Sequence, residues 1–343
     1  MRAAVLEQVG QLVVKEVPMP HRDDQSAVVQ VKACGVCGSD LERVMHKGTY
    51  HFPTIPGHEF AGVIEQGCDD FAQGERVVVA PIMPCKTCES CRSGFYGQCE
   101  NYNFLGSRCD GGFAEYVKVP QENILPLPDS ISFPEAAVIE PAAVTLHGVR
   151  KLNINVDDVV TVLGCGALGL LAVQLAKIMG ASVVIAVDIK AKNLELATQL
   201  GADYVVNSRT EDLPQRLAQL SKRGVSVVIE TAGVASVQAQ AIELVKPQGR
   251  ILYLGTAHAD VVLPPTVFEK IIRNELALLG SWNSYSADFP GADWRSIINL
   301  IAQGRLDVKT LTSHCVTMRE LPEVIAKMYQ REMEYTKVVM LNQ

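Results

Sequence analysis

The stretch VVTVLGCGALGLLAVQLAKIMG, residues 159–180, joins a short apolar run to a glycine-rich turn and a helical segment. The turn has the pattern G-x-G-x-x-G between a predicted strand and a predicted helix, the setting in which this pattern binds a dinucleotide. Its glycines allow a tight turn, close approach of the backbone to a pyrophosphate, and packing of the helix on the strand. The helix N-terminus adds unpaired N–H groups for phosphate oxygens. The expected contacts are Gly164, Gly166, Ala167, Leu168 and Gly169.

From about residue 155 onward, short apolar runs alternate with helical segments. Continuous Val, Ile and Leu runs predict strands buried on both faces, and their alternation with helices predicts a parallel, doubly wound sheet. The fold class is therefore α/β, and six strands match the count of a Rossmann nucleotide fold. The expected strands are residues 159–164, 182–188, 202–207, 225–233, 249–255 and 276–281.

The second of these strands ends at Asp188, nineteen residues after Gly169. A carboxylate at this point can accept hydrogen bonds from the adenosine ribose and would repel a 2′-phosphate, which favours NAD over NADP. Lys190 and Lys192 follow closely and offer charge that offsets this repulsion. The alternative for Asp188 is a solvated carboxylate at a strand end.

The regions on either side of this sheet show a different pattern of segments. Up to about residue 150, short β-like segments separated by Gly and Pro predict a partly closed antiparallel β-domain. After about residue 286 the segments are again short and end in a helix and a strand that we expect to rejoin the first domain. With 343 residues, two domains are expected. We place them at 1–150, completed by 286–343, and 151–285.

Composition narrows the class of protein. Apolar residues make up 48% and charged residues 20% of the chain, as in a folded protein. A net charge of −7 argues against double-stranded nucleic acid as the main partner. The N-terminus lacks the apolar core of a signal peptide, and no apolar run reaches the ~20 residues that cross a bilayer. We expect a soluble cytoplasmic protein with no membrane partner.

Four cysteines lie within fifteen residues, Cys85, Cys88, Cys91 and Cys99, spaced C-x2-C-x2-C-x7-C. A ferredoxin-type cluster would place its fourth cysteine three residues on and follow it with proline, and a nucleic-acid zinc finger would split its ligands between two knuckles. Free thiols are the remaining alternative. Four thiolates around one zinc ion would leave no open coordination position, so such a site would brace a loop and carry no chemistry.

A second set of candidate ligands lies upstream and downstream of this lobe. Cys37, His58 and Glu140 provide a thiol, an imidazole and a carboxylate, the ligands of an open zinc site whose fourth position takes water or substrate. Taken singly, each residue has an ordinary alternative as a buried thiol, a hydrogen-bonded histidine or a surface acid. Together with a dinucleotide loop, they fit one mechanism.

The Gly57-His58-Glu59 motif, the cysteine lobe and the glycine loop, in this order, resemble zinc-dependent medium-chain alcohol and polyol dehydrogenases over essentially the whole chain. The resemblance implies a GroES-like catalytic domain, a Rossmann coenzyme domain, and a homodimer or homotetramer. It also implies two zinc ions per chain, one catalytic and one structural. By resemblance, Cys37, His58 and Glu140 bind the catalytic zinc, with Glu59 as an exchanging ligand or nearby base. Thr231, Gly233, Leu254 and Gly255 would then lie near the nicotinamide.

Three departures from the family pattern concern the proton relay, a loop away from the proposed ligands, and the substrate. Glu42 replaces a histidine that passes protons outward, which leaves the relay beyond Ser39 open. The stretch at 67–69 is shortened. Asn283-Ser284 replaces an Arg-Tyr pair that grips polyols, which makes free sorbitol a poorer substrate.

The expected activity is NAD-dependent oxidation of a secondary alcohol, on a polyol or polyol phosphate, to the ketose. Zinc would stabilise the alkoxide and Ser39 would accept or relay the proton. A phosphate group would need a basic contact, for which Arg108, Lys47 and Arg295 are candidates. The alternatives are the same chemistry on a free polyol, a sugar acid or threonine, and a non-catalytic, zinc-stabilised nucleotide-binding module.

Overall fold

The computed structural model describes residues 1–222 and 224–342, which divide into two compact units. The first unit contains Met1–Glu140, Ser284–Gln303 and the chain from Val308 on, and the second contains Pro141–Asn283 and Gly304–Asp307. The units divide inside helix α4 (Ile139–Lys151), whereas the sequence pattern changes about ten residues later. A helix that continues across a domain boundary gives no change of periodicity at the boundary itself, so the sequence places it later.

The second unit is built on a parallel sheet of six strands in the order β12-β11-β10-β13-β14-β15. Each apolar run expected to form a strand forms one of them, so this part of the prediction is confirmed. The central strands β10 and β13 are buried at every residue, as expected for strands covered on both faces. The strands are β10 (Val159–Leu163), β11 (Val183–Asp188), β12 (Tyr204–Asn207), β13 (Val225–Glu230), β14 (Val245–Tyr253) and β15 (Ala277–Gly280).

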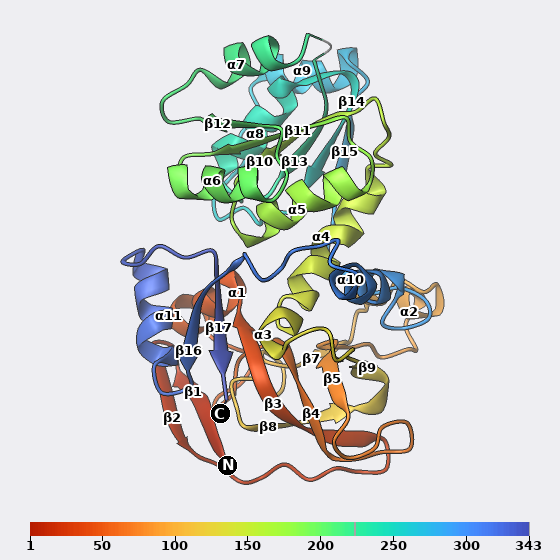
Figure 1. The fold of residues 1–343 in the computed structure, drawn as a ribbon, viewed down its shortest axis with the longest axis vertical. Coiled ribbons are helices and arrows are strands. Elements are labelled where there is room, and N and C mark those ends of the chain that lie inside the picture. Colours follow the sequence, from red (N-terminus) through yellow and green to blue (C-terminus); the bar gives the residue numbers. More distant parts are fainter. Residues whose placement is uncertain (223, 343) are drawn as a thin grey trace. The chain divides into compact units, whose positions relative to one another are not determined.

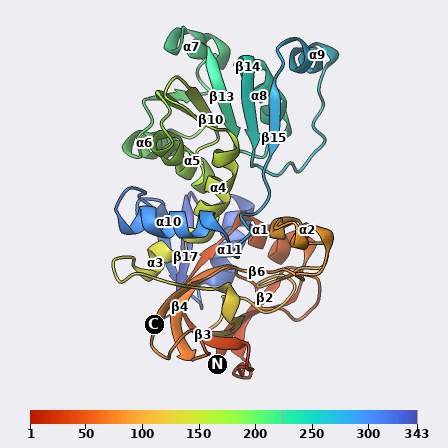
Figure 2. The same cartoon turned by 90° about the vertical axis from the view of Figure 1, so that its right-hand side faces the viewer.

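Helices cover both faces of this sheet. The strand order runs outward in opposite directions from β10 and from β13, and right-handed crossovers in opposite directions place their helices on opposite faces. Figure 2 shows α5 and α6 on one side of the strands and α8 and α9 on the other. The point between β10 and β13 is therefore the topological switch point, where open α/β sheets bind ligands. The helices are α5 (Ala167–Ile178), α6 (Ala191–Gln199), α7 (Leu213–Leu220), α8 (Ala235–Leu244) and α9 (Pro265–Arg273).

The first unit is built on a mostly antiparallel sheet in the order β16-β17-β3-β4-β5-β9, with β8 also paired to β3. The last strand, β17, pairs antiparallel with β3, so the end of the chain returns to the first unit (Figure 1). A hairpin of β1 and β2 adds a small second sheet. The strands are β1 (Arg2–Gln8), β2 (Gln11–Glu16), β3 (Ser26–Val36), β4 (Glu59–Gln66), β5 (Arg76–Val79), β6 (Ile82–Met83), β7 (Asn103–Phe104), β8 (Tyr116–Pro120), β9 (Ile124–Pro126), β16 (Thr312–Thr317) and β17 (Lys337–Leu341).

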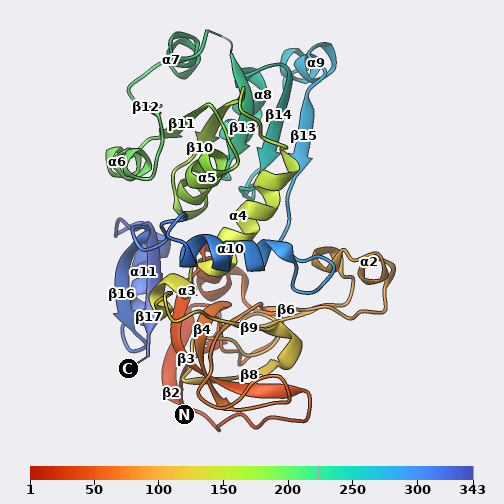
Figure 3. The ribbon, with the colours of Figure 1, turned by 45° about the vertical axis from the view of Figure 1, so that its right-hand side comes forward.

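Short helices connect the strands of this unit. The cysteine-rich segment, with α2, extends to one side of the sheet (Figure 3). Helix α10 carries Trp294, which is completely buried and stacks on Tyr285. No helix of the described residues is both long and apolar enough to cross a membrane. The helices are α1 (Gly38–Glu42), α2 (Glu89–Arg92), α3 (Phe133–Ala136), α10 (Ala292–Ala302) and α11 (Leu321–Gln330).

The pairing of β3 with β4 brings two distant motifs together. Gly35 in β3 pairs with Glu59 in β4, so Cys37, just past the end of β3, lies beside His58, just before β4. The strands approach so closely that a Cβ on Gly62 would lie 1.9 Å from the carbonyl oxygen of Gln30. Only glycine fits there. The close pairing fixes the positions of the ends of β3 and β4 relative to each other.

Candidate active site

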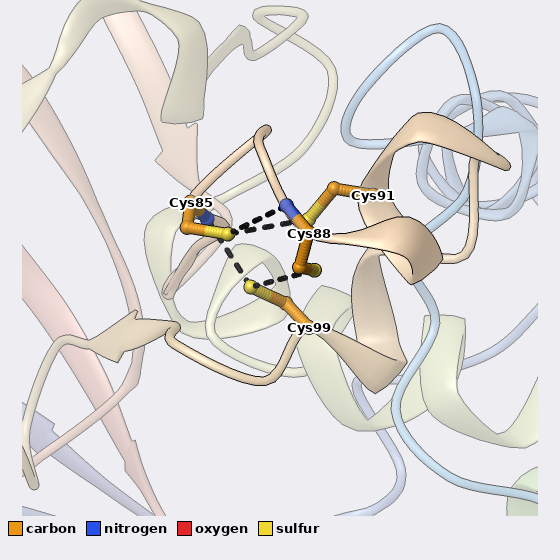
Figure 4. Close-up of side chains that lie close together, drawn as sticks. All are labelled: Cys85, Cys88, Cys91 and Cys99. Atoms are coloured by element: carbon orange, nitrogen blue, oxygen red, sulfur yellow. Dashed lines mark hydrogen bonds between the residues drawn. The ribbon is translucent and has the colours of Figure 1, made fainter.

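The four cysteines of the lobe converge on one point (Figure 4). Their sulfur atoms all lie within 4.8 Å of one another, and the Cys85–Cys91 and Cys88–Cys99 sulfur pairs are each 4.0 Å apart. Zinc–sulfur bonds of ~2.3 Å in a tetrahedron place the sulfur atoms about 3.8 Å apart. The four side chains therefore fit a single tetrahedral zinc ion.

Hydrogen bonds already favour the thiolate form at two of these cysteines. The pKa of Cys85 falls to about 5, first because the Thr87 hydroxyl donates to its sulfur and then because the N–H groups of Thr87 and Cys88 do so. The pKa of Cys88 is lowered mainly by N–H groups of Glu100 and Cys91. Burial raises the pKa of Cys91 to about 12. Hydrogen bonds therefore favour the thiolate form at Cys85 and Cys88, and a bound metal ion would supply the stabilisation that the buried Cys91 lacks.

The variant Cys88→Ser removes one of the four sulfur ligands. We expect it to hold one zinc ion fewer per chain than the unaltered protein and to melt at a lower temperature, because structural zinc contributes directly to folding free energy. Elemental analysis and thermal unfolding measure both effects. The matched control is Cys315→Ser, since Cys315 is exposed on β16 and outside the lobe. Equal zinc content in the two variants would contradict this interpretation.

A second group of ligand atoms lies at the ends of β3 and β4. Atoms of Cys37, His58 and Glu59 lie within 4.8 Å of one another. The imidazole of His58 is only 4% exposed and Glu59 is 1% exposed, so two of these ligands are held inside the unit. A thiol, an imidazole and a carboxylate at this separation form a donor set that suits zinc.

Asp40 contacts two residues of this cluster, His58 and Cys37. Its Oδ1 atom lies 3.2 Å from Nδ1 of His58, and its Oδ2 atom accepts a hydrogen bond of 3.0 Å from the N–H of Cys37. A carboxylate behind a ligating histidine fixes the orientation of the ring and leaves Nε2 for the metal. The sequence interpretation missed Asp40, although its place three residues after Cys37 at the start of a helix is a readable signal.

The same contacts set the protonation of the buried pair. Burial raises the pKa of Asp40, but the His58 imidazole and the Arg43 guanidinium outweigh burial and lower it. Burial lowers the pKa of His58, but Asp40 and the Cys37 thiol outweigh it and hold that pKa well above its usual range. The surroundings of His58 therefore favour a positive charge on its ring, and the same negative groups would favour a cation bound there.

Lys337 on β17 forms a buried ion pair with Glu59. Its ammonium group contacts Oε2 of Glu59 and donates to the carbonyl oxygen of Val36 at 3.0 Å. Burial lowers the pKa of Lys337, but Glu59 and Cys37 outweigh it, so the pKa is raised and the side chain stays charged. A Cβ on Gly35 would lie 2.2 Å from the same carboxylate oxygen, so glycine makes room for the pair.

Glu140, predicted as the third ligand, is also buried, in the first turn of α4. Its pKa is raised to about 7, first by burial and also by Glu59, against the lowering effect of His58 and Lys337. Among the described residues the group within 4.8 Å contains Glu59 and not Glu140. The ligand role of Glu140 stays a prediction. The effect of His58 and Glu59 on the pKa of Glu140 supports that role, because it places the three groups close together.

Ser39, predicted to handle the proton, lies in α1. Its hydroxyl oxygen accepts a hydrogen bond of 2.8 Å from Nη1 of Arg43. A guanidinium cannot accept a proton, so Arg43 polarises the hydroxyl and cannot extend a proton path beyond it. Glu42, at the position where a histidine is expected, pairs instead with Lys47 at 3.5 Å.

The glycine loop has the geometry that its pattern predicts. Gly164 adopts a φ of +89°, and a Cβ on Gly169 would lie 1.9 Å from the carbonyl oxygen of Gly164. A Cβ on Gly166, in contrast, would have no neighbouring atom within 4 Å. This open space precedes the first turn of α5, where Ala167 and Leu168 bring N–H groups without intrahelical partners. The loop therefore fits a pyrophosphate at Gly166.

Asp188 lies at the end of β11 beside this loop. Its carboxylate accepts hydrogen bonds from the N–H of Cys165 at 2.7 Å and of Lys190 at 2.8 Å, and from the side chain of Asn193 at 3.2 Å. These bonds fix the carboxylate next to the glycine turn, as expected of a ribose-binding acid.

The other predicted cofactor contacts lie in the loops after β13 and β14. The Thr231 hydroxyl donates to the carbonyl oxygen of Gly164 at 2.8 Å, which ties this loop to the glycine turn. Glu230, which the sequence interpretation missed, joins the remaining two loops. Its carboxylate accepts from the N–H of Gly233 at 2.8 Å, and its carbonyl oxygen accepts from the N–H of Leu254 at 2.9 Å. Burial raises the pKa of Glu230.

The chain matches two protein-family models. The alcohol dehydrogenase GroES-like domain covers residues 23–129 and the zinc-binding dehydrogenase domain covers residues 167–302. Among curated proteins, it is 38% identical to galactitol 1-phosphate 5-dehydrogenase of Escherichia coli over 92% of both chains. It is 31% identical to sorbitol dehydrogenase of Bacillus subtilis over 99% of this chain and 96% of that one.

Solved structures agree with these matches. The crystal structure of galactitol-1-phosphate dehydrogenase from Escherichia coli covers both chains completely, with a TM-score of 0.93 and 35% identity. A zinc-binding dehydrogenase from Sinorhizobium meliloti bound to NADP has a TM-score of 0.91 and 32% identity, with 99% of each chain covered. An alcohol dehydrogenase from Escherichia coli complexed with NADH has a TM-score of 0.90 and 27% identity, covering 100% of this chain and 99% of that one. The chain therefore belongs to the zinc-dependent medium-chain alcohol and polyol dehydrogenases, a family of oxidoreductases.

Proposed function

We propose that this enzyme oxidises a secondary alcohol of a polyol phosphate, such as galactitol 1-phosphate, to the ketose with NAD. The observation that carries the proposal is the buried cluster of Cys37, His58 and Glu59, backed by Asp40. It is an open set of metal ligands in a chain that also carries a dinucleotide loop. A non-catalytic nucleotide-binding module has no need of such a set.

The cluster fits a zinc ion in charge as well as in donor type. Against the lowering effect of burial, Asp40 raises the pKa of His58, and Glu59 and Glu140 raise the pKa of Lys337, so negative charge gathers around the cluster. A divalent cation would offset part of this charge. Cys37 and His58 would hold it, with Glu140 and Glu59 as the carboxylate ligands. When bound, zinc stabilises the alkoxide of the substrate, and NAD accepts the hydride.

The residues of the chain orient the substrate and move its proton. Asp40 faces Nδ1 of His58 at 3.2 Å, and Lys337 holds one carboxylate oxygen of Glu59. Ser39 is proposed to relay the substrate hydroxyl proton: its oxygen takes that proton while its own hydroxyl proton passes on to water, and Arg43 holds the hydroxyl in place. Because Arg43 cannot take the proton further, the onward path leads directly to water.

The preference for NAD over NADP rests on Asp188. Its carboxylate is fixed by three hydrogen bonds, so it cannot swing away from a 2′-phosphate without losing them. Relatives with bound NADP and with bound NADH have the same fold, so the fold alone does not select the nucleotide.

The substrate class is tested by initial rates of nicotinamide reduction with galactitol 1-phosphate, galactitol, sorbitol, xylitol and threonine, each with NAD and with NADP. We expect kcat/KM to be highest for galactitol 1-phosphate with NAD, by about 10-fold or more over each alternative. Mass spectrometry identifies the ketose phosphate. A higher kcat/KM for threonine or for an unphosphorylated polyol would overturn the proposed substrate, and a higher value with NADP would overturn the proposed coenzyme.

A further inference from the structure

Arg108, in the loop after β7, stands out among the basic residues near the candidate metal site. Its guanidinium carbon lies 4.0 Å from the centre of the Tyr50 ring and 4.3 Å from the centre of the Tyr102 ring. Its Nε atom is buried and has no hydrogen-bond partner. Within residues 1–222 and 224–342, no carboxylate lies within ion-pair distance of it. Arg108 is thus half-buried and held between aromatic rings, and N–H groups of its guanidinium remain without an acceptor among the described residues.

The two other basic candidates are already engaged. Lys47 is exposed and pairs with Glu42 at 3.5 Å. Arg295 donates from Nη1 to the carbonyl oxygen of Asp288 at 3.1 Å and is exposed. Asp110 lies close to Arg108 in sequence, but its carboxylate accepts from the N–H of Ile55 at 2.9 Å.

The loop that carries Arg108 packs directly on the motif that carries His58. A Cβ on Gly106 would lie 2.5 Å from the carbonyl oxygen of Gly57, so the two backbones are in contact. The ring of Phe104, at the start of the loop, lies 5.6 Å from that of His58. In turn, the Tyr102 ring packs edge-on against Phe104 at 6.4 Å. A series of ring contacts therefore links His58, through Phe104 and Tyr102, to the guanidinium of Arg108.

Hydrogen bonds to the backbone of the Arg108 loop hold it against the segment that carries Tyr50 and His51. His51 places Nε2 3.1 Å from the carbonyl oxygen of Arg108, and the N–H of Tyr50 donates to Ser107 at 3.3 Å. These bonds join the segment after α1 to the loop after β7. A guanidinium held by stacking keeps its in-plane N–H groups for a planar or tetrahedral oxyanion.

We propose that Arg108 binds the phosphate group of the substrate, while the alcohol to be oxidised lies at the Cys37–His58 cluster. This inference rests on the proposed function and adds the residue that selects a phosphate monoester over a free polyol. The terminal N–H groups of the guanidinium, for which the described residues supply no acceptor, provide charge-assisted hydrogen bonds to the phosphate oxygens. Tyr50 and Tyr102 hold the guanidinium in place and so act as positioning residues.

The test compares the ratio of kcat/KM for galactitol 1-phosphate to that for galactitol in the unaltered enzyme and in Arg108→Met, Arg108→Lys and Lys47→Met. We expect the ratio to fall about 10- to 100-fold in Arg108→Met, because hydrogen bonds to a charged group are lost. Arg108→Lys keeps the positive charge but loses the paired N–H donors of the guanidinium, so its ratio should lie between those of the unaltered enzyme and Arg108→Met. Lys47→Met should match the unaltered enzyme. An unchanged ratio in Arg108→Met would overturn the inference.

Binding of sn-glycerol 1-phosphate, measured by calorimetry, separates this inference from the proposed function and does not require turnover. If the unaltered enzyme binds it and Arg108→Met binds at least about 10-fold more weakly, the phosphate site stands even when no polyol phosphate is oxidised. Equal binding to both proteins would overturn the site even if galactitol 1-phosphate is the substrate. Galactonate, a sugar acid, is the third probe. If Arg108→Met weakens the binding of galactonate but not of sn-glycerol 1-phosphate, the phosphate assignment is overturned. Arg108→Lys guards against a folding defect, since it retains the aliphatic stem that packs on the rings.

Discussion

Replacement of His58 by alanine is expected to lower kcat/KM by at least about 1,000-fold. Polarisation by a bound metal stabilises the developing alkoxide by several kcal/mol, and each 1.36 kcal/mol corresponds to about a factor of ten in rate. The His58→Ala variant loses the imidazole ligand and leaves Asp40 without its buried partner. The measurement is the initial rate of NADH formation, at saturating NAD, with the substrate that proves best for the unaltered enzyme.

The matched control is His21→Ala, which removes an exposed imidazole between β2 and β3. This control should retain full activity. His58→Ala should still hold the zinc of the cysteine lobe and show an unaltered circular dichroism spectrum, which separates loss of the active metal from loss of the fold. Turnover by His58→Ala within a few-fold of the unaltered enzyme would remove the metal-based mechanism.

Replacement of Lys337 by methionine is expected to lower the free energy of unfolding of the first unit by about 3–5 kcal/mol. Removing one partner of a buried ion pair leaves the other charge uncompensated, and here that charge is the carboxylate of Glu59, which is 1% exposed. Trp294 is completely buried in the same unit, so its fluorescence during urea unfolding reports this loss.

Two further variants show whether the effect comes from the buried charge. Lys327→Met breaks an exposed pair with Glu323 on α11 and should leave the unfolding midpoint unchanged. The double variant Glu59→Gln with Lys337→Met removes both charges and should recover part of the stability lost by Lys337→Met alone. A Lys337→Met midpoint equal to that of Lys327→Met would show that the buried pair contributes no stability.

The elements that sequence reasoning predicted well are those with local patterns. The strand, glycine turn and helix at 159–180 lie next to one another in the chain, and the Val-rich runs of the central strands β10 and β13 are buried at every residue, whereas the edge strands β12 and β15 are partly exposed. The four cysteines are likewise close in sequence. A loop of that length allows few arrangements besides convergence, and the sulfur atoms do converge.

The contacts that sequence reasoning missed join distant parts of the chain. Lys337 and Glu59 are 278 residues apart, and only the pairing of β17 with β3, and of β3 with β4, brings them together. The contact between Arg108 and Tyr50 likewise depends on the packing of Gly106 on Gly57. Such contacts depend on tertiary packing, which residue spacing does not encode.

Anomalous diffraction at the zinc absorption edge, from crystals of the unaltered enzyme, locates both proposed metal ions in one experiment. We expect two peaks per chain, one within the cysteine lobe and one about 2.3 Å from the sulfur of Cys37 and about 2.0 Å from a ring nitrogen of His58. A single peak in the lobe, with no metal between Cys37 and His58, would contradict the account.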